Sequence, residues 1–347
     1  MPQRTHNVVE VLGDGISSEL SASIHRVAEA LPVTIKFHPV DLSRAARESR
    51  GNALYDEAEE AIRRHHSAIK YPTETFKESP NAVLRERLDF SVIYRPVATI
   101  PSIPTHFSRS IDLHIVRVAT GGTYDDAGRR VGTDAAVSMR VIEKKPCTEA
   151  AWFAFGLANK LGCSVVSTSK WTIQRAADGL FEEACDGVAR RYPGVPYRRE
   201  LFDALLAHLV MKPEAYRVIV TPNEYGDFLS DLACGLIGSV GLGDSASYSF
   251  TSDGVVENAL FDPAGGTAPD IAGRDIANPT AALLAFSTYL RHVGEDKAAG
   301  ALRKGLFDAI AAGQRTRDLG GSLGTTAFTD AVCQRATDLL TQPAERK

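Results

Sequence analysis

The sequence lacks several features that mark common classes of protein. It has no stretch of about 18 apolar residues, and its start, MPQRTHNVVEVLGDG, has no basic segment followed by an apolar one. We therefore expect a soluble, cytoplasmic protein without a membrane partner. A dominant charge is also missing, because 39 basic residues face 43 acidic ones, for a net charge of −4. A nucleic-acid partner held by bulk electrostatics is not expected.

Cysteine is scarce, and the five cysteines form no CxxC pair, so we expect reduced, mostly buried thiols rather than disulfides or a zinc site. The nine histidines show no HExxH spacing. GxGxxG is absent too, so a Rossmann fingerprint is excluded. The glycine-rich stretch GGTAPDIAGRDIANPTA leads into a helix and could let a backbone approach a nucleotide closely. Taken alone, it could equally be an ordinary turn-rich connection.

What the sequence does contain is an alternation of short β-branched runs with stretches of helical periodicity, which predicts an α/β fold. The length of 347 residues suggests about two domains. Because no linker separates them, we expect a small domain, residues 98–241, inserted into a large one made of residues 1–97 and 242–347. Among the predicted helices, YDEAEEAIRRHHSAI covers residues 55–69, and TEAAWFAFGLANKLG ends at Gly162, a typical C-terminal cap.

Two aspartates in NEYGDFLSD, Asp227 and Asp231, lie four residues apart behind Gly226. On a helix, this spacing places both carboxylates on the same side. Acidic residues near a helix N-terminus are stabilised by the helix dipole, so the pair could simply begin a helix. Carboxylate oxygens at this spacing also suit Mg²⁺ or Mn²⁺. The motif alone leaves both interpretations open.

Three arginines occupy positions where α/β proteins bind ligands. Arg85 lies in a helix-like stretch, and we expect Arg95 and Arg117 to end strands. Guanidinium groups bind carboxylates in a bidentate manner, although each arginine taken singly is also typical of a surface ion pair. Lys170 follows a strand and Tyr124 follows Arg117. Alone, these two would be read as a solvated lysine and a packing tyrosine.

Together, these segments resemble the β-decarboxylating dehydrogenases, the family of isocitrate, homoisocitrate and 3-isopropylmalate dehydrogenases. The resemblance runs from LGDGISSE to RTRDLGGSLGTTAFTDAV and is most specific in PNEYGDFLSDLACGLIGSVGL and GGTAPDIAGRDIANPTAA. It implies an open α/β sheet without a Rossmann fingerprint, in two domains around a cleft, and a homodimer with shared active sites. It further implies NAD-dependent, metal-assisted oxidative decarboxylation of a 2-hydroxy-3-carboxy acid.

The resemblance assigns the catalytic and metal-binding residues. Asp227 and Asp231 match the two aspartates that bind Mg²⁺ or Mn²⁺, and Asp203 matches a third aspartate that reaches the metal from the partner subunit. Lys170 matches the catalytic lysine, also supplied across the dimer. Tyr124 matches the catalytic tyrosine, which protonates C3 of the product.

The cofactor residues follow in the same way. Thr75 matches a threonine near the nicotinamide ribose, and Asn278 matches an adenine contact. Asp270 and Ile271 match the pair that favours NAD, since an acid there can bind a ribose 2′-hydroxyl and would repel a 2′-phosphate. The family's HGSAPD is GGTAPD here, so Gly265 replaces a histidine that packs on adenine, and weaker NAD binding is expected.

The substrate is indicated by Ser79, Asn81 and Arg85, which fit the isocitrate pattern S-x-N-x-x-L-R, while Arg95 and Arg117 match further carboxylate-binding arginines. The isopropylmalate enzymes carry leucines there, on which an unpaired carboxylate would be costly. We therefore expect an isocitrate-like, tricarboxylate substrate. The alternative for Ser79 is a simple helix cap.

Two further interpretations stay open. Departures from the family pattern suggest a specialised pathway of secondary metabolism, with a phosphonate analogue of isocitrate, or with 3-isopropylmalate, homoisocitrate or tartrate, as substrate. A catalytically silent regulatory subunit is the other. Such subunits typically lose the metal or lysine residues, which this chain keeps.

Overall fold

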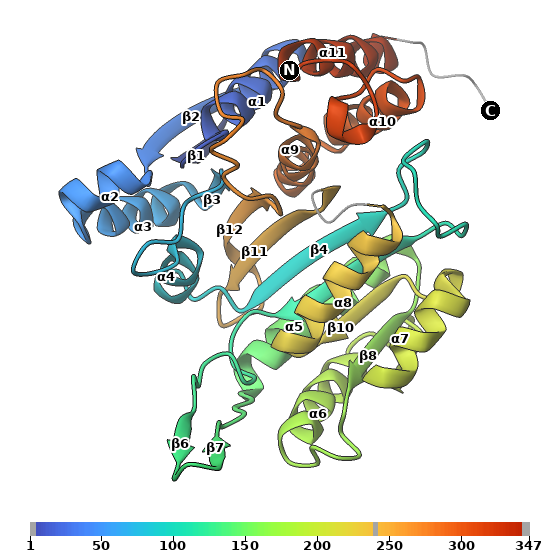
Figure 1. Ribbon diagram of the computed structural model, residues 1–347. Helices are drawn as coiled ribbons and strands as arrows, with labels where there is room; N and C mark the ends of the chain where they lie inside the picture. Colours follow the sequence, from blue (N-terminus) through green and yellow to red (C-terminus); the bar gives the residue numbers. More distant parts are fainter. Residues whose placement is uncertain (1–4, 239–241, 342–347) are drawn as a thin grey trace.

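The computed structural model describes residues 5–238 and 242–341 as an α/β fold (Figure 1). Its strands are β1 Thr5–Leu12, β2 Thr34–Asp41, β3 Ser67–Lys70, β4 Val92–Ala98, β5 Asp112–Val118, β6 Arg129–Val131, β7 Ala135–Val137, β8 Val165–Ser169, β9 Tyr197–Leu201, β10 Val218–Thr221, β11 Asp244–Phe250 and β12 Val256–Pro263. Its helices are α1 Ser17–Ala30, α2 Arg44–Arg50, α3 Ala53–His65, α4 Pro80–Arg87, α5 Lys144–Leu161, α6 Ala177–Ala189, α7 Phe202–Met211, α8 Asn223–Leu236, α9 Thr280–His292, α10 Asp296–Ala311 and α11 Thr325–Thr341.

One large sheet runs through the molecule in the strand order β2-β1-β3-β12-β11-β4-β5-β10-β8-β9. The pairs β12–β11, β11–β4 and β4–β5 are antiparallel, and the outer strands pair in parallel. The predicted α/β class is confirmed. The sheet is continuous across the predicted domain boundaries, and the division of the chain at residues 97/98 and 241/242 stays a prediction.

Two local predictions from the sequence were wrong. The helix predicted through residue 69 ends at His65, because His66 adopts a left-handed conformation (φ 59°), and residues 67–70 form the fully buried strand β3. Arg95 lies inside β4 rather than at its end. The helix end at Gly162 is confirmed, since this residue is the left-handed C-cap of α5.

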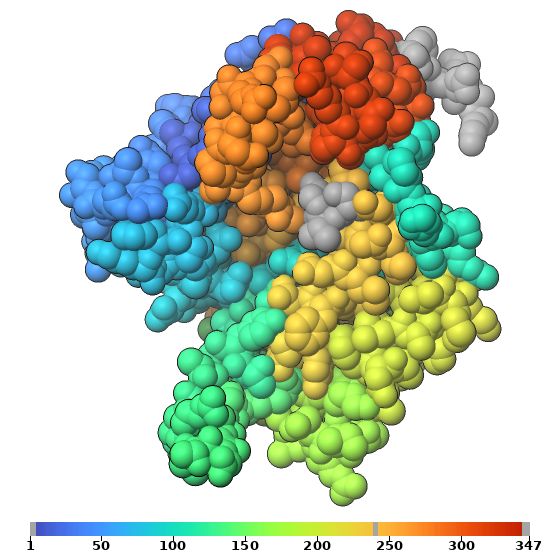
Figure 2. All heavy atoms as spheres, in the orientation of Figure 1, coloured from blue at the N-terminus to red at the C-terminus, as the bar shows by residue number. Residues whose placement is uncertain are grey.

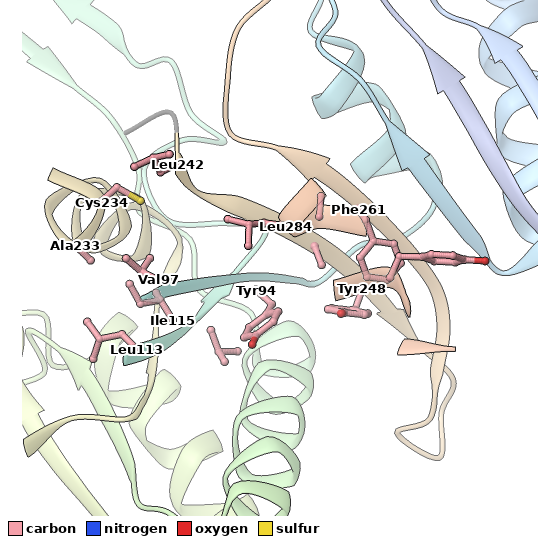
Figure 3. Packing of buried hydrophobic residues seen from close by; sticks show 14 of the residues in the cluster. Tyr94, Val97, Leu113, Ile115, Ala233, Cys234, Leu242, Tyr248, Phe261 and Leu284 are labelled. Atoms are coloured by element: carbon pink, nitrogen blue, oxygen red, sulfur yellow. The ribbon is translucent and has the colours of Figure 1, made fainter. Parts of the chain in front are cut away.

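Along β4 and β5, successive side chains point to opposite faces of the sheet. This alternation decides which side chains lie on the face covered by α8. Tyr94 and His114 point to the α5 side, where the Tyr94 hydroxyl lies 2.7 Å from Nδ1 of His114. Every second residue therefore points to the other face, which carries Arg95 on β4 and Arg117 on β5. Figure 3 shows the buried side of α8 resting on this face, with Ala233 and Cys234 near Val97 and Ile115.

Other sequence-based expectations concern thiols and membranes. All five cysteines are free thiols, and Cys147, Cys185 and Cys234 are buried, as predicted. Within residues 5–238 and 242–341, no helix combines the length and apolar character needed to cross a bilayer.

Candidate active site

The helix α8 carries the two aspartates of NEYGDFLSD. It begins at Asn223, after Pro222, and its buried side holds Gly226, Leu229 and Ala233 at helical spacing. Asp227 and Asp231 therefore lie one turn apart on the open side. Arg95 Nη1 lies 3.6 Å from Oδ1 of Asp227 and 3.5 Å from Oδ1 of Asp231, so a single cation contacts both carboxylates. The helix-start interpretation is confirmed, since the aspartates lie near the beginning of α8, and the metal-binding interpretation stays a prediction.

Arg117 and Tyr124 meet the same carboxylate. Arg117 is buried and donates hydrogen bonds through Nη1 to Asp227 and through Nε to Oδ1 of Asn223 at 2.9 Å. Burial lowers the pKa of Arg117 to about 10, so it is still protonated at neutral pH. The Tyr124 hydroxyl donates to Oδ2 of Asp227 at 3.1 Å, and burial together with the charge of Asp227 raises the pKa of Tyr124. Tyr124 therefore keeps its proton at neutral pH, as an acid must.

Gly226 allows Arg117 to cross α8. A Cβ at Gly226 would lie 2.6 Å from Cγ and 2.7 Å from Cβ of Arg117. We expect Gly226→Ala to displace Arg117, to lower the free energy of unfolding by about 1–3 kcal/mol and to lower kcat/KM by about 10–100-fold. Gly235 is the control on the same helix, because a Cβ there would meet no atom within 4 Å. Equal kcat/KM for the two variants would contradict the role of Gly226.

Lys170 and Asp203 form a second pair. Lys170 Nζ donates to Oδ1 of Asp203 at 2.8 Å, and this hydrogen bond holds the pKa of Asp203 below its usual range. Among the described residues, no three His, Cys, Asp or Glu side chains gather where they could hold a metal, so one chain does not bring Asp203 together with Asp227 and Asp231. The two α8 carboxylates are hard oxygen donors on an open face and fit Mg²⁺ or Mn²⁺, provided that further ligands come from elsewhere.

A cavity of about 150 Å³ is lined by three of the residues predicted to bind substrate, Asn81, Arg85 and Arg95. It lies between α4 and the sheet, on the side that Figure 2 shows hollowed between the light-blue α4 and the yellow α8. Nε of Arg85 and Nε of Arg95 are buried without a hydrogen-bond partner. Arg85 also has no carboxylate within 4 Å among the described residues. Burial lowers the pKa of Arg85; the charge of Asp262, which lines the same cavity, opposes this shift, and the neighbouring Arg95 adds to it.

Ser79 is the N-cap of α4, yet its side chain makes no capping hydrogen bond. Its hydroxyl is therefore not used as the simple-cap alternative requires. Ser79 precedes Pro80, which begins the helix and needs no hydrogen-bond acceptor for its nitrogen.

The cofactor residues predicted from the sequence lie on exposed or half-buried loops. Thr75 and Asp270 are exposed, while Ile271 and Asn278 are half-buried. Oδ1 of Asn278 accepts from the amide of Thr280, the first residue of α9, at 3.0 Å, so Asn278 forms a local turn before the helix. At Gly265 a Cβ would meet nothing within 4 Å, which leaves open space where the family has a histidine ring. The open backbone and the free Asp270 carboxylate fit a dinucleotide with an unmodified ribose.

Several polar residues of the site were missed from the sequence. Asn223 donates to the Gly121 carbonyl at 2.9 Å and so ties α8 to the Tyr124 loop. Lys70 is buried near Asp262, which lines the cavity with Arg85 and Arg95, and burial lowers the pKa of Lys70 to about 8. A signal was present for Lys70, since a lysine ending the short apolar strand SAIK is unusual in a core. None was present for Asn223, which reads as an ordinary helix-start residue.

Several known proteins are similar to this chain in sequence and in fold. The family model for isocitrate/isopropylmalate dehydrogenase matches residues 7–332. The probable isocitrate dehydrogenase [NAD] subunit alpha, mitochondrial, of Caenorhabditis elegans is 33% identical over 338 residues, which are 96% of this chain and 92% of that protein. The isocitrate dehydrogenase [NAD] catalytic subunit 6, mitochondrial, of Arabidopsis thaliana is 35% identical over 327 residues, 92% of this chain and 86% of the relative. The crystal structure of isocitrate dehydrogenase from Methylococcus capsulatus superposes with a TM-score of 0.84 at 31% identity, covering 96% of this chain and 99% of the other.

Fold and sequence together define an enzyme, an oxidoreductase of the β-decarboxylating dehydrogenase class. The chain belongs to the isocitrate/isopropylmalate dehydrogenase family. This family typically uses NAD or NADP together with a divalent metal, and it acts on small carboxylates.

Proposed function

We propose that the protein carries out the NAD-dependent oxidative decarboxylation of an isocitrate-like 2-hydroxy-3-carboxy acid whose C3 substituent ends in an anion. The observation that carries this choice is the pair of buried, partnerless Nε atoms of Arg85 and Arg95 in one cavity with Asn81. Two neighbouring guanidinium groups repel each other, and although Asp262 lines the same cavity, both Nε atoms stay without a partner, so a ligand anion could bind to them. An apolar isopropyl group would leave both donors unsatisfied.

The arginines would orient the substrate. Arg85, with Asn81 and the free hydroxyl of Ser79, would hold the anion on C3, and Arg95 and Arg117 would bind the other carboxylates. In the structure, Arg95 and Arg117 contact Asp227. Substrate carboxylates would replace Asp227 as their partner, which frees that carboxylate for Mg²⁺ or Mn²⁺. Asp203 of the partner subunit would complete the metal site with Asp227 and Asp231.

Lys170 and Tyr124 would move the protons. The bound metal would polarise the substrate's C2 oxygen and stabilise negative charge on it, and NAD⁺ would accept the hydride from C2. Lys170, paired with Asp203, would take part in removing the C2 hydroxyl proton. The bond between C3 and its carboxylate then breaks to release CO₂. Tyr124, whose pKa is raised, would deliver a proton to C3.

A homodimer is part of the proposal, because Lys170 and Asp203 would act in the neighbouring site. Exposed apolar side chains support it. The β6–β7 hairpin projects away from the main sheet (Figure 1) and presents Val131 and Val137, while Met139 and Val141 follow it. A two-stranded hairpin alone is marginally stable, so packing against a second copy would account for this apolar surface.

The substrate is tested by following NADH formation with Mg²⁺ or Mn²⁺. We expect turnover of isocitrate or of its analogue with a phosphonate in place of the γ-carboxylate, since either anion fits Arg85, Asn81 and Ser79. Rates with NADP⁺ should be lower, because the Asp270 carboxylate repels a 2′-phosphate. Preferential turnover of 3-isopropylmalate would overturn the proposed anionic substituent. Homoisocitrate and tartrate are to be assayed in the same way. No turnover of any of these acids would favour a silent regulatory subunit instead.

A further inference from the structure

One buried arginine outside the proposed site contacts two of the segments that carry its residues. Arg140 follows the β6–β7 hairpin and is largely buried. Its Nη2 donates to Oδ1 of Asp178 at 2.7 Å, and its Nη1 pairs with the Glu224 carboxylate. The guanidinium also lies over the ring of Tyr225, 4.7 Å from the centroid. Asp178 is fully buried and Glu224 nearly so.

Each carboxylate is tied to a different part of the site. Oδ2 of Asp178 accepts from the backbone amide of Lys170 at 2.7 Å and from the Tyr225 hydroxyl at 3.3 Å. Glu224 belongs to the first turn of α8, three residues before Asp227. Arg140 thus connects the segment of Lys170 with the helix of the two proposed metal ligands.

The third connection reaches the Tyr124 loop. Val141, the neighbour of Arg140, exchanges two backbone hydrogen bonds with Gly122, at 2.7 and 3.0 Å. Gly122 also packs against Glu224, since a Cβ there would lie 2.0 Å from Oε2. Residue 122 has a φ of 76°, so both its conformation and its surroundings favour glycine.

We propose that Arg140 is a positioning residue that fixes Tyr124, Lys170 and Asp227 relative to one another. Two buried carboxylates in one place repel each other, and the planar guanidinium of Arg140 contacts both from fixed directions, at Oδ1 of Asp178 and Oε1 of Glu224. The other oxygen of Glu224, Oε2, is buried without a hydrogen-bond partner. In a dimer with shared sites, Tyr124 and Asp227 would act in the chain's own site and Lys170 in the site of the partner subunit. The contacts of Arg140 would then connect the two active sites of the dimer. The proposal rests on the proposed function, since it concerns the same three groups.

The variant Arg140→Lys tests the proposal while keeping a positive charge between the two carboxylates. A lysine keeps one positive charge but has no planar fork that could hold both carboxylates. We expect kcat to fall by about 10–100-fold, the range typical of residues that orient ligands indirectly. KM should change by less than about twofold, because Arg85, Arg95 and the cofactor loop belong to other segments. Arg140→Met should be more severe, and if it does not fold, Arg140→Lys alone decides.

Hydrogen exchange supplies a readout that does not depend on turnover. In Arg140→Lys, we expect faster amide exchange in residues 120–125, 168–173 and 222–228, and unchanged exchange in α10 and α11. Leu306→Ala is the control, because it truncates a fully buried α10 side chain and so destabilises the fold without touching these segments.

The outcomes separate the two proposals. Unchanged kcat and unchanged exchange in Arg140→Lys would overturn the positioning role and leave the proposed function intact. A loss of activity with uniformly faster exchange, as in Leu306→Ala, would also overturn it, because it would indicate general destabilisation. If the wild-type protein turned over none of the acids, the proposed function would fail, and the exchange pattern would still decide whether Arg140 orders the three segments.

Discussion

Asp227→Asn is expected to reduce turnover by about 10³-fold or more, because Asp227 is a proposed charged ligand of the metal that would stabilise the developing oxyanion. Asn keeps the shape of the side chain: its Oδ1 can still accept from Arg117, and its Nδ2 can donate to the Tyr124 hydroxyl oxygen. The fold should therefore persist, although two arginines lose a counter-charge. The measurements are kcat, Mn²⁺ affinity by titration calorimetry and the thermal midpoint. Affinity for Mn²⁺ should fall together with kcat.

Asp253→Asn is the matched control, since Asp253 is an exposed aspartate in the turn between β11 and β12. It should leave all three quantities unchanged. Removal of metal from the wild-type enzyme by a chelator should imitate Asp227→Asn, and added Mg²⁺ or Mn²⁺ should restore only the wild-type enzyme. Wild-type turnover or wild-type Mn²⁺ affinity in Asp227→Asn would reject the metal assignment.

The sequence was most informative where the signal is local. The four-residue spacing of Asp227 and Asp231 predicts one helix face, and α8 has that face. Gly162 ends α5 as a left-handed cap, which local backbone chemistry also requires. The error at His66 has a local cause as well: RRHHSAI continues a helical pattern, whereas burial of residues 67–70 in the sheet overrides that propensity.

Contacts between distant segments could not be predicted in this way. Arg140 meets Asp178 and Glu224 across 38 and 84 residues, and a lone arginine after a hairpin reads as a solvent-exposed charge. Similarly, nothing in the local pattern NEYGD indicates that Gly226 lies under the Arg117 side chain. Family resemblance supplied the roles of Arg85 and Ser79, while only the structure shows that Nε of Arg85 lacks a partner and that Ser79 makes no cap.

The second large expected effect is the recovery of enzyme activity when two inactive variants are combined in mixed dimers. Lys170→Met removes the proposed proton-transfer group, so this variant and Asp227→Asn should each be nearly inactive as homodimers. If Lys170 serves the partner's site, a mixed dimer contains one site with both defects and one site with neither. Unfolding and refolding the two variants together in equal amounts should therefore restore about a quarter of the wild-type activity, because half of the dimers are mixed and each has one intact site.

The recovered activity distinguishes a shared site from a site within one chain. If Lys170 and Asp227 of the same chain worked together, every site in a mixed dimer would carry one defect, and mixing would restore nothing. The pairing of Lys170 with Asp203, and the failure of one chain's described carboxylates to form a three-ligand cluster, favour recovery. Mixing Asp227→Asn with Asp231→Asn is the control: both defects lie on α8 of the same chain's site, so neither site of a mixed dimer is intact. Recovery in the first mixture and none in the second would require Lys170 to cross the subunit interface.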